Sequence, residues 1–411
     1  MKKTTIIIGA GASGLMAAIN IKTDNNEVII LERNSEAGKK ILATGNGRCN
    51  YWNSNQDLSN YNSKNKELLK DIITEENCHS VLEEFNKLGI IPKIKSGYYY
   101  PSSNQATSIR NALLNEIENK MITIKTNSYV EDINKNEEGF LVKTSNETLS
   151  CDYLIIATGG KAAPKTGSDG IGYSFASKFN HTIINPLPAL VQLRAHEKYL
   201  KTWAGVRTDV KVYLKESGQI KKKTEGEIQL TDYGVSGICI YNLSSEVAYG
   251  LSKNKKEELV INFLPFVEIN PKQFLEEREK YIVKSTISSS LEKILNYKLV
   301  KVILEKSNIK EDKYYKDLTE EEKNNLIKNL TNFTIEIRET NSFKDAQATA
   351  GGIPLTEINI KTMESRLVKN LYFTGEILDV NGICGGYNLG FAWISGILAG
   401  RSISNKNDKN T

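Results

Sequence analysis

The sequence predicts an α/β protein with one domain of parallel strands that is split in the sequence, and an inserted β-rich domain that carries a small helical subdomain. Three observations predict this fold. A β-branched run, closely spaced glycines and an apolar segment follow one another at the start of the chain. A second glycine-opened apolar segment lies near its end. Between them, from residue 188 to residue 345, strand-like alternation gives way to charged helical patterns.

The first element is a buried parallel strand at Thr4–Ile8, followed by a cluster of glycines and a helix-forming segment. The cluster fits G-x-G-x-x-G in the expected strand–turn–helix context. Gly9 permits the tight turn, Gly11 lets the backbone approach a pyrophosphate, and Gly14 lets helix and strand pack closely. The N-terminus of the helix then offers free N–H groups to the anion. We therefore predict dinucleotide binding at Gly9, Gly11, Ala12, Ser13 and Gly14.

A second strand, Val28–Leu31, ends in Glu32 and Arg33. Glu32 lies about 20 residues beyond the glycines, where an acidic residue hydrogen-bonds the adenosine ribose hydroxyls. The order strand, glycines, helix, strand and acid predicts a Rossmann-type unit. The carboxylate disfavours a 2′-phosphate, so NADP is not expected at this site. The unit alone fits FAD as well as NAD.

The stretch ILATGNGRCN, residues 41–50, favours FAD. A simple NAD domain needs no second glycine-rich loop just beyond the ribose acid, whereas a longer cofactor must also be held at its far half. Lys40 and Arg48 place positive charge near the pyrophosphate and the flavin. Cys49 is interpreted as a small residue that lines the flavin, because no partner cysteine lies close in sequence. The predicted contacts of this loop are Lys40, Thr44, Gly45, Asn46, Arg48 and Cys49.

A third strand, Cys151–Ala157, is closed by Thr158 and Gly159, and a small β-meander precedes it. We expect this strand to return to the sheet beside the adenylate, with Thr158 and Gly159 near the cofactor. Val130 in the meander is expected where backbone groups contact the adenine.

The C-terminal part completes the predicted FAD-binding domain. Leu371–Thr374 is a strand, a Gly-Glu turn and Asp379 follow, and two glycines open an apolar helix. Small residues at Ala392, Gly396 and Gly400 are spaced for close packing on one face. The N-terminus of this helix can stabilise negative charge on a reduced flavin, and Asp379 can bind ribityl or phosphate-proximal hydroxyls. The predicted contacts are Gly375, Glu376, Asp379, Gly386, Tyr387, Asn388 and Leu389.

Four stretches resemble one bacterial flavoprotein family: GAGASGLMAA, GKKILATGNGRCN, IIATGGKAAPKTGSDGIGY and GEILDVNGICGGYNLGFAWISGILAG. The family is often labelled NAD(P)/FAD-dependent oxidoreductase or aminoacetone-oxidase-like, and it includes a reductase of 3-dehydro-bile acids. The resemblance covers nearly the whole chain. It implies FAD, a Rossmann-type domain split in sequence, and an inserted domain.

We predict the FAD-binding domain at residues 1–187 and 346–411, and the inserted substrate domain at 188–345. The pattern of the insert predicts a β-rich part over 188–268, with turns at Ser217-Gly218 and Tyr233-Gly234. It predicts a helical part over 269–332. We expect it to fold over the flavin face and to build much of the substrate pocket. Gly351-Gly352 either approaches the flavin ring closely or forms an ordinary turn.

The predicted function is that of an FAD-dependent oxidoreductase acting on a small molecule by hydride transfer at the flavin N5. Reduction of an enone or bile-acid-like C=C bond is favoured. A tRNA-modifying flavoprotein, an amine oxidase, a dithiol–disulfide reductase using Cys49 and Cys384, and a non-catalytic flavin-binding protein stay open. No second G-x-G-x-x-G has its strand–helix context, so NAD(P)H would bind only transiently as electron donor. Candidate catalytic residues are Tyr387, Arg48 and Cys49.

Composition limits the partners. The 411 residues carry a net charge of +5, and lysines alternate with acids, so we do not expect nucleic acid as a partner. Lys221–Lys223 is the densest basic run, and it fits a surface hairpin. Five scattered cysteines and three histidines predict neither a disulfide framework nor a metal site, and suit the cytoplasm. No transmembrane segment is expected, and the oligomeric state stays open.

Overall fold

The computed structural model describes residues 2–282 and 285–408, and the chain forms two compact units. The first unit combines residues 1–187 with residues 347–411, so both ends of the chain belong to it. The second unit is formed by Pro188–Ala346. Strand β12 (Ile184–Ala189) leads out of the first unit, and it pairs with strand β20 (Ala348–Gly352), which leads back.

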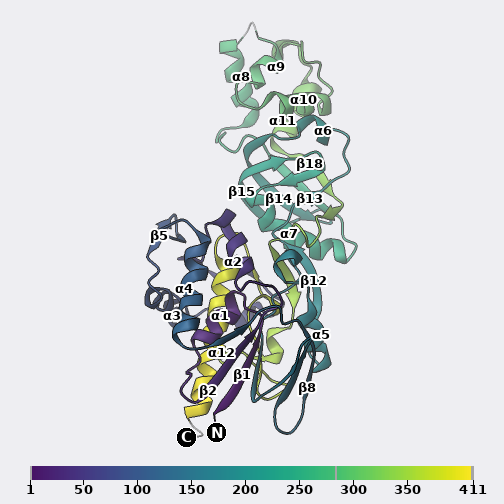
Figure 1. Ribbon diagram of the computed structural model, residues 1–411. Helices are drawn as coiled ribbons and strands as arrows, with labels where there is room; N and C mark the ends of the chain where they lie inside the picture. Colours follow the sequence, from purple (N-terminus) through teal and green to yellow (C-terminus); the bar gives the residue numbers. More distant parts are fainter. Residues whose placement is uncertain (1, 283–284, 409–411) are drawn as a thin grey trace. The chain divides into compact units, whose positions relative to one another are not determined.

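A seven-stranded sheet forms the centre of the first unit (Figure 1). Its strands follow the order β21-β22-β23-β11-β1-β2-β7, and the five from β23 to β7 are parallel. The C-terminal strand β23 therefore lies beside strands from the N-terminal part. The bounds are β1 Lys3–Ile8, β2 Asn26–Leu31, β7 Thr123–Lys125, β11 Tyr153–Ile156, β21 Ile358–Asn359, β22 Glu364–Ser365 and β23 Leu371–Phe373.

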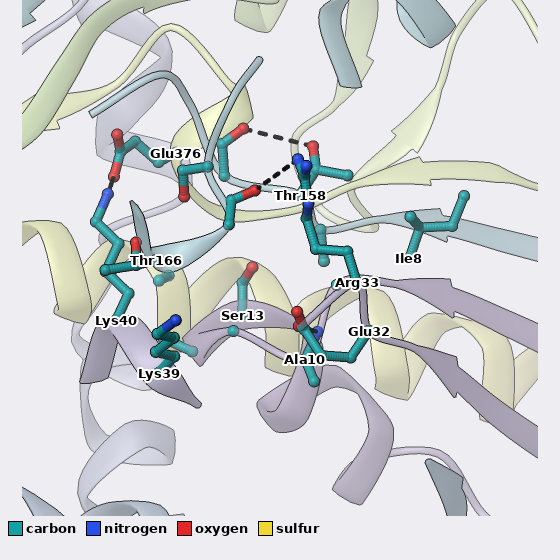
Figure 2. A pocket seen from close by; sticks show the side chains of 18 of the residues that line it. Ile8, Ala10, Ser13, Glu32, Arg33, Lys39, Lys40, Thr158, Thr166 and Glu376 are labelled. Atoms are coloured by element: carbon teal, nitrogen blue, oxygen red, sulfur yellow. Dashed lines mark hydrogen bonds and ion pairs between the residues drawn. The ribbon is translucent and has the colours of Figure 1, made fainter. Parts of the chain in front are cut away.

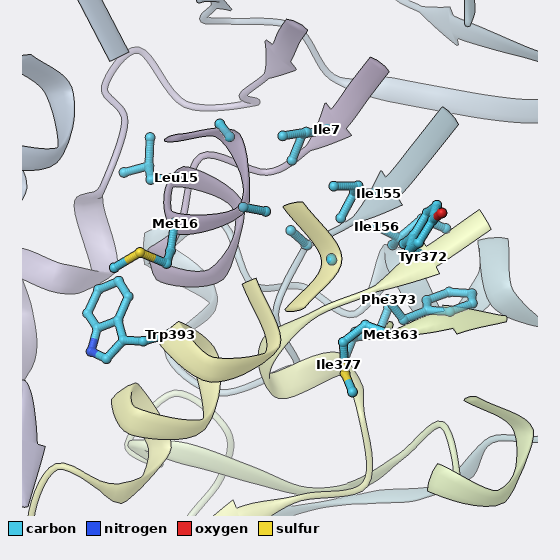
Figure 3. Close-up of a cluster of buried hydrophobic side chains, with 14 of the residues drawn as sticks. Ile7, Leu15, Met16, Ile155, Ile156, Met363, Tyr372, Phe373, Ile377 and Trp393 are labelled. Atoms are coloured by element: carbon cyan, nitrogen blue, oxygen red, sulfur yellow. The ribbon is translucent and has the colours of Figure 1, made fainter. Parts of the chain in front are cut away.

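Helices α1 (Ala12–Ile19) and α12 (Tyr387–Asp408) pack against each other beside this sheet. A Cβ atom on Gly396 would lie 2.6 Å from the Ser13 carbonyl oxygen, and one on Gly400 would lie 2.4 Å from that of Ala17. Glycine is therefore required at both contacts, as the small-residue spacing predicts. Figure 3 shows Met16 of α1 and Trp393 of α12 in the buried core of this unit.

The remaining elements of the first unit surround the parallel sheet. An antiparallel meander has the order β10-β9-β8, and a second small sheet has the order β3-β6-β5. The bounds are β3 Trp52–Asn53, β4 Tyr61–Asn62, β5 Pro92–Lys95, β6 Tyr98–Pro101, β8 Val130–Lys135, β9 Phe140–Thr144, β10 Thr148–Cys151, β24 Asn381–Gly382, α2 Lys39–Ala43, α3 Glu75–Lys87, α4 Ala106–Asn119 and α5 Ile171–Lys178, with 3-10 turns η1 Thr44–Gly47, η2 Leu58–Asn60, η3 Lys66–Asp71, η4 Pro164–Thr166, η6 Leu355–Glu357 and η7 Gly375–Ile377.

One predicted strand is divided. Strand β10 ends at Cys151 in the meander, and β11 begins at Tyr153 in the parallel sheet. Asp152 lies between them, and its carboxylate accepts a hydrogen bond from the Thr4 backbone N–H at 2.8 Å and pairs with Lys3 at 2.7 Å. The single apolar run Cys151–Ala157 therefore serves two sheets, because Asp152 ties the chain to the start of β1.

A seven-stranded antiparallel sheet forms the second unit, with the order β18-β17-β14-β15-β16-β13-β19. Helix α7 packs on it, and β14 and β15 are joined by the two-residue turn Ser217-Gly218, as predicted. Lys221 lies on the following strand and pairs with Glu216 across the hairpin. The bounds are β13 Leu193–Arg194, β14 Arg207–Glu216, β15 Gln219–Leu230, β16 Gly234–Ser236, β17 Glu257–Asn262, β18 Phe333–Ile337, β19 Glu339–Thr340 and α7 Ile238–Ser252.

The helical part of the second unit lies over residues 271–331, as the charged periodicity predicts. Thr319 caps the last helix with a capping box, in which its side chain and that of Glu322 satisfy each other's backbone N–H groups. The bounds are α8 Pro271–Ile282, α9 Ile287–Leu291, α10 Tyr297–Lys306, η5 Tyr315–Asp317 and α11 Glu320–Thr331, and the short helix α6, Leu200–Trp203, lies earlier in the unit. Among the residues that the structure describes, no helix is both long and apolar enough to cross a bilayer.

Candidate functional site

A long cavity opens at the carboxyl ends of β1, β2 and β11, where doubly wound α/β sheets bind their ligands (Figure 2). All of its lining residues belong to the first unit. Of the residues predicted from the sequence, those on the cavity wall are Gly9, Gly11, Ala12, Ser13, Glu32, Arg33, Lys40, Thr44, Val130, Thr158, Gly159, Glu376, Asn388 and Leu389. The N-terminal and C-terminal parts of the chain thus share one cavity.

The first glycine loop has two structural glycines and one that faces open space. Gly9 has φ of +105°, and a Cβ atom there would lie 2.6 Å from the Ala157 carbonyl oxygen. A Cβ atom on Gly14 would lie 2.0 Å from the Gly9 carbonyl oxygen. A Cβ atom on Gly11 would meet nothing within 4 Å. The space beside Gly11 is therefore part of the cavity, and it lies next to the N-terminus of α1, where an anion is stabilised.

Glu32 is held rigidly at one end of the cavity. Its side chain is buried, its Oε2 accepts from the Ala10 N–H at 2.9 Å, and its Oε1 accepts from the backbone N–H of Asn34 at 2.8 Å. Arg33 pairs with Asp169 and lies over the Tyr129 ring, 4.9 Å from its centroid. A fixed carboxylate beside a stacked guanidinium suits a ribose and an adenine.

Lys40 and Glu376 pair on the cavity wall (Figure 2). The Lys40 Nζ lies 2.8 Å from Glu376 Oε2, and Oε1 of the same carboxylate accepts from the Thr349 hydroxyl at 2.6 Å. Thr349 in turn accepts from the Lys161 N–H at 2.9 Å. This network joins α2, the loop after β11, β20 and η7, so it fixes segments that are far apart in the sequence.

The second glycine loop has a left-handed backbone. Gly45, Asn46 and Gly47 all have positive φ, of 56°, 53° and 78°. Thr44 lines the cavity, whereas the residues from Gly45 to Arg48 are exposed beside it. The Arg48 Nε–H donates to the Gly45 carbonyl at 3.3 Å, and the guanidinium lies 5.4 Å from the Tyr100 ring centroid.

Cys49 is fully buried behind this loop. Burial raises the pKa of its thiol to about 12, so the thiol stays protonated at neutral pH. Burial also raises the pKa of the Cys384 thiol to about 12. Neither cysteine forms a disulfide. A protonated buried thiol is a poor nucleophile, which favours the packing interpretation of Cys49.

Some residues of the C-terminal segment 375–389 line the cavity, and others pack in the core. Asn388 and Leu389, in the first turn of α12, line the cavity, and the Asn388 amide bridges the N–H and carbonyl of Gly382, both at 2.9 Å. Gly375 and Gly386 instead permit close packing, because a Cβ atom would lie 2.6 Å from the Ser13 hydroxyl and 2.8 Å from the Trp52 backbone, respectively.

Two predicted residues of this loop are buried away from the cavity wall. The Tyr387 ring packs edge-on against Tyr61 at 5.5 Å, and burial raises its pKa to about 12. Asp379 is 1% exposed, and its carboxylate accepts from the backbone N–H groups of Lys64, at 2.8 Å, and Gly351. Burial raises the pKa of Asp379 to about 6. Its oxygens bind the backbone of neighbouring loops, and Asp379 is not among the residues that line the cavity.

About half of the wall residues are not among those predicted from the sequence. Ser128 and Tyr129 precede Val130, Lys39 precedes Lys40, and Gln347 begins the return from the second unit. Ile171, which opens α5, also lines the cavity. Some of these residues could have been predicted because they lie next to a predicted residue in the sequence. No sequence motif indicated Gln347 or Phe175. The additional wall residues are Ile8, Ala10, Leu31, Lys39, Ile41, Ser128, Tyr129, Ala157, Thr166, Gly167, Ser168, Ile171, Phe175, Gln347 and Ala392.

The fold and the cavity define a flavoprotein oxidoreductase with a Rossmann domain. A family model described as "HI0933-like protein Rossmann domain" matches residues 3–402, and the chain belongs to this family. The family implies FAD as the cofactor.

Two known relatives support this assignment, and one solved structure shares the fold. A 3-dehydro-bile acid Δ(4,6)-reductase of Clostridium scindens is 38% identical over 97% of this chain and 98% of that protein. A ribosomal RNA dihydrouridine synthase of Escherichia coli is 30% identical over 95% of each chain. The solved 3-ketosteroid Δ1-dehydrogenase of Sterolibacterium denitrificans is 12% identical, with a TM-score of 0.50 over 98% of this chain and 100% of that one, which shows a shared fold.

Proposed function

We propose that this protein is an FAD-dependent reductase that adds a hydride and a proton across a C=C bond conjugated with a carbonyl group. The observation that carries the proposal is the single cavity that runs from Glu32 and Arg33, past the first glycine loop, to Thr44, Asn388 and Leu389. A cavity with an acid at one end and the start of a helix at the other suits a dinucleotide with a redox ring at its far half.

The residues present fit FAD. The open space beside Gly11 accepts a pyrophosphate against the α1 N-terminus, and Glu32 keeps lone pairs for ribose hydroxyls. The α12 N-terminus, with Asn388 and Leu389 on the wall, stabilises negative charge at the other end. Bound FAD supplies a hydride from N5 of its reduced ring. We expect NAD(P)H to bind transiently as the electron donor, since the chain has one dinucleotide motif in its proper context.

The relatives support the choice of substrate bond. One is named as a Δ(4,6)-reductase of a 3-dehydro-bile acid, and another as a synthase of dihydrouridine in ribosomal RNA. Both names describe the addition of two hydrogens across a C=C bond conjugated with a carbonyl. The higher identity, 38%, favours a small enone as the substrate of this chain.

Arg48 is the best of the three candidate catalytic residues. Its guanidinium is exposed beside the second glycine loop, whereas Cys49 and Tyr387 are buried. Hydride addition to the β-carbon of an enone moves negative charge onto the carbonyl oxygen. Arg48 donates hydrogen bonds to that oxygen and stabilises the developing charge. Replacement of Arg48 by alanine should lower kcat by about 100-fold, while flavin binding is unchanged.

Anaerobic mixing tests the function. The reduced holoenzyme is mixed with a 3-oxo-Δ4 steroid, a simple cyclic enone, an amine, a quinone and a uridine oligonucleotide, and flavin reoxidation is followed. We expect an enone to reoxidise the flavin and to gain two hydrogens by mass. Reoxidation by quinone or oxygen alone, with no C=C acceptor reduced, contradicts the proposal.

A second candidate acceptor is the uracil ring of an RNA, whose C5=C6 bond is also conjugated with a carbonyl. The relative named for ribosomal RNA favours it. The chemistry is the same as for the enone, so the two candidates differ in how the substrate is held.

A further inference from the structure

The hydroxyl group of Thr349 is fully hydrogen-bonded behind the wall of the cofactor cavity. Thr349 lies in β20 and is completely buried. Its oxygen accepts from the backbone N–H groups of Lys161, at 2.9 Å, and Ala162, at 3.0 Å. A hydroxyl group has two acceptor lone pairs and one proton. Because both lone pairs are in use, the proton is directed to Oε1 of Glu376, which lies 2.6 Å away.

The Glu376 carboxylate is held by a donor at each oxygen. Oε1 accepts from Thr349, and Oε2 lies 2.8 Å from Nζ of Lys40 (Figure 2). The same Nζ donates to the Ala162 carbonyl at 3.3 Å. The side chains of Lys40 and Glu376 are 27% and 17% exposed, so water screens their charges only in part. A Cβ atom on Gly160 would lie 2.6 Å from the Thr349 Cβ and 2.8 Å from Glu376 Oε1, so this arrangement requires glycine at position 160.

The Lys40–Glu376 pair lies beside the first glycine loop. The segment before Lys40 is hydrogen-bonded to that loop, because the Gly38 N–H donates to the Ala10 carbonyl at 2.8 Å. Glu376 lies close to the start of α1, because a Cβ atom on the residue before it would lie 2.6 Å from the Ser13 hydroxyl. Both members of the pair line the cavity. The pair is therefore next to the space that is proposed to hold the pyrophosphate.

The position of Glu376 creates an electrostatic problem for an anionic cofactor. A carboxylate beside a pyrophosphate is unfavourable, because like charges repel strongly where water screens them poorly. Lys40 offsets the charge of Glu376 only while the carboxylate faces its ammonium group. The hydrogen bond from Thr349 keeps that orientation, since two backbone N–H groups fix the Thr349 hydroxyl itself.

We propose that Thr349 is a positioning residue for FAD binding, which holds the Glu376 carboxylate against Lys40 and so keeps its charge from repelling the pyrophosphate. The inference rests on the FAD-binding part of the proposed function. It goes beyond that function because it assigns a role to a buried residue that does not line the cavity. Thr349 acts on the cofactor only through Glu376, so its effect must depend on the charge of that side chain.

Titration of the flavin-free full chain with FAD, followed by flavin fluorescence, tests the role of Thr349. We expect T349V to weaken FAD binding by about tenfold at low salt, the effect of losing a hydrogen bond to a charged group. The loss should shrink to less than about threefold at about 1 M salt, where charges are screened beyond about 3 Å. T349S keeps the hydroxyl and should bind FAD like the wild type.

A matched control removes another buried threonine hydroxyl from the first unit. Thr5 lies in β1, is completely buried and does not line the cavity. T5V should therefore bind FAD like the wild type at every salt concentration. Thermal unfolding of each flavin-free variant checks that it is folded. T349A, which also lacks the hydroxyl, takes the place of T349V in all comparisons if the valine variant does not fold.

A second pair of variants shows whether Thr349 acts through the carboxylate. E376Q and E376Q/T349V should bind FAD with equal affinity, because glutamine has no charge for the hydroxyl to direct. A residue that only packs would lower the affinity by the same factor in both backgrounds and at all salt concentrations. Equal losses in the two backgrounds, or a loss that does not change with salt, would overturn the positioning role.

The failure of this inference and that of the proposed function give different results. FAD affinity is measured without any substrate, so a chain that shows the expected affinities but reduces no enone contradicts the reductase proposal and leaves the role of Thr349 in place. Tight FAD binding by T349V at low salt contradicts the role of Thr349 alone. A wild-type chain that binds no FAD contradicts both.

Discussion

Gly11 and Gly14 are three residues apart and have different structural roles. A Cβ atom on Gly11 would meet no neighbouring atom within 4 Å. A Cβ atom on Gly14 would lie 2.0 Å from the Gly9 carbonyl oxygen. The backbone of Gly11 is extended, with φ of −83°, which a β-branched residue adopts readily. A substitution at Gly11 therefore fills the cavity without disturbing the fold, whereas one at Gly14 forces helix and strand apart.

Gly11→Val should abolish flavin binding while the apoprotein keeps its melting temperature within about 2 °C, a shift below about 1 kcal/mol. Gly14→Ala should destabilise the protein by about 2 kcal/mol or more, through a backbone clash. Flavin absorbance after purification and thermal unfolding of the apoproteins measure the two effects. Retention of FAD by Gly11→Val would contradict the placement of the pyrophosphate.

Cys49 provides a second test at the scale of one residue. With its pKa raised to about 12 and its side chain fully buried, the native thiol should resist alkylation at pH 8 and react only after unfolding. Cys49→Ser should show no change in the visible spectrum of the reduced enzyme. Loss of a long-wavelength charge-transfer band in that variant would instead establish a redox thiol.

At the scale of elements, a buried histidine after α5 forms hydrogen bonds to the antiparallel edge of the main sheet. His181 follows α5, and its Nδ1–H donates to Glu357 at 2.8 Å, while Nε2 accepts from the Ser365 hydroxyl of β22 at 2.8 Å. Burial lowers the pKa of His181 below its usual range, so the folded protein keeps the ring neutral. The unfolded chain binds the proton below about pH 6.5, and stability therefore falls as the pH drops below that value.

Wild-type protein should lose up to about 1.4 kcal/mol per pH unit below about pH 6.5 from this group. His181→Gln should be less stable at pH 7.5 but should show a shallower decline toward pH 5. Thermal unfolding across that range measures the difference between the two curves. Parallel curves would show that His181 titrates normally in the folded state.

Glu257 produces the opposite pH dependence in the second unit. It begins β17, is 1% exposed, and neither carboxyl oxygen has a hydrogen-bond partner within the described residues. Burial, followed by the nearby Glu216, raises its pKa to about 7. The folded state holds a proton that the unfolded chain has released above about pH 4.3, so this contribution to stability is lost as the pH rises toward 7.

Glu257→Gln should therefore raise the melting temperature at pH 8, by an amount worth about 1–2 kcal/mol, and have little effect at pH 4.5. Gly250→Ala is the companion change, because a Cβ atom there would lie 1.7 Å from Glu257 Oε1 and should destabilise the unit. Calorimetry at the two pH values checks both. An equal effect of Glu257→Gln at both values would mean that the carboxyl is not protonated in the fold.

Element patterns in the sequence predicted the parallel strands, the meander, the opening of α12 and the capped helix after Thr319, because each depends on local periodicity and turn chemistry. The same reasoning could not place Asp379, whose carboxylate is fixed by loops distant in sequence. Lys93 and Lys95 alternate with Ile94 and form a cluster with Arg48 only through strand pairing and stacking, which no linear pattern contains.

At the scale of the whole molecule, the cavity wall is formed only by residues of the first unit. Strands β12 and β20, which lead to and from the second unit, pair with each other. A chain in which residues 191–345 are replaced by a short glycine–serine loop should therefore fold and retain FAD, and it should lose reduction of the substrate. Flavin fluorescence and a titration with FAD measure retention. Loss of flavin from a folded deletion variant would show that the second unit helps to bind it.

The packing of α12 on α1 also fixes when the cofactor can be acquired during synthesis. Asn388 and Leu389 are made only after nearly all of the chain has left the ribosome, whereas Gly11 and Glu32 are made first. The N-terminal strands must wait for their last partners while the second unit, a contiguous segment, completes its own fold. A chain that stops before α12 therefore lacks Asn388 and Leu389 of the cavity wall and leaves the side of α1 that α12 covers exposed to solvent.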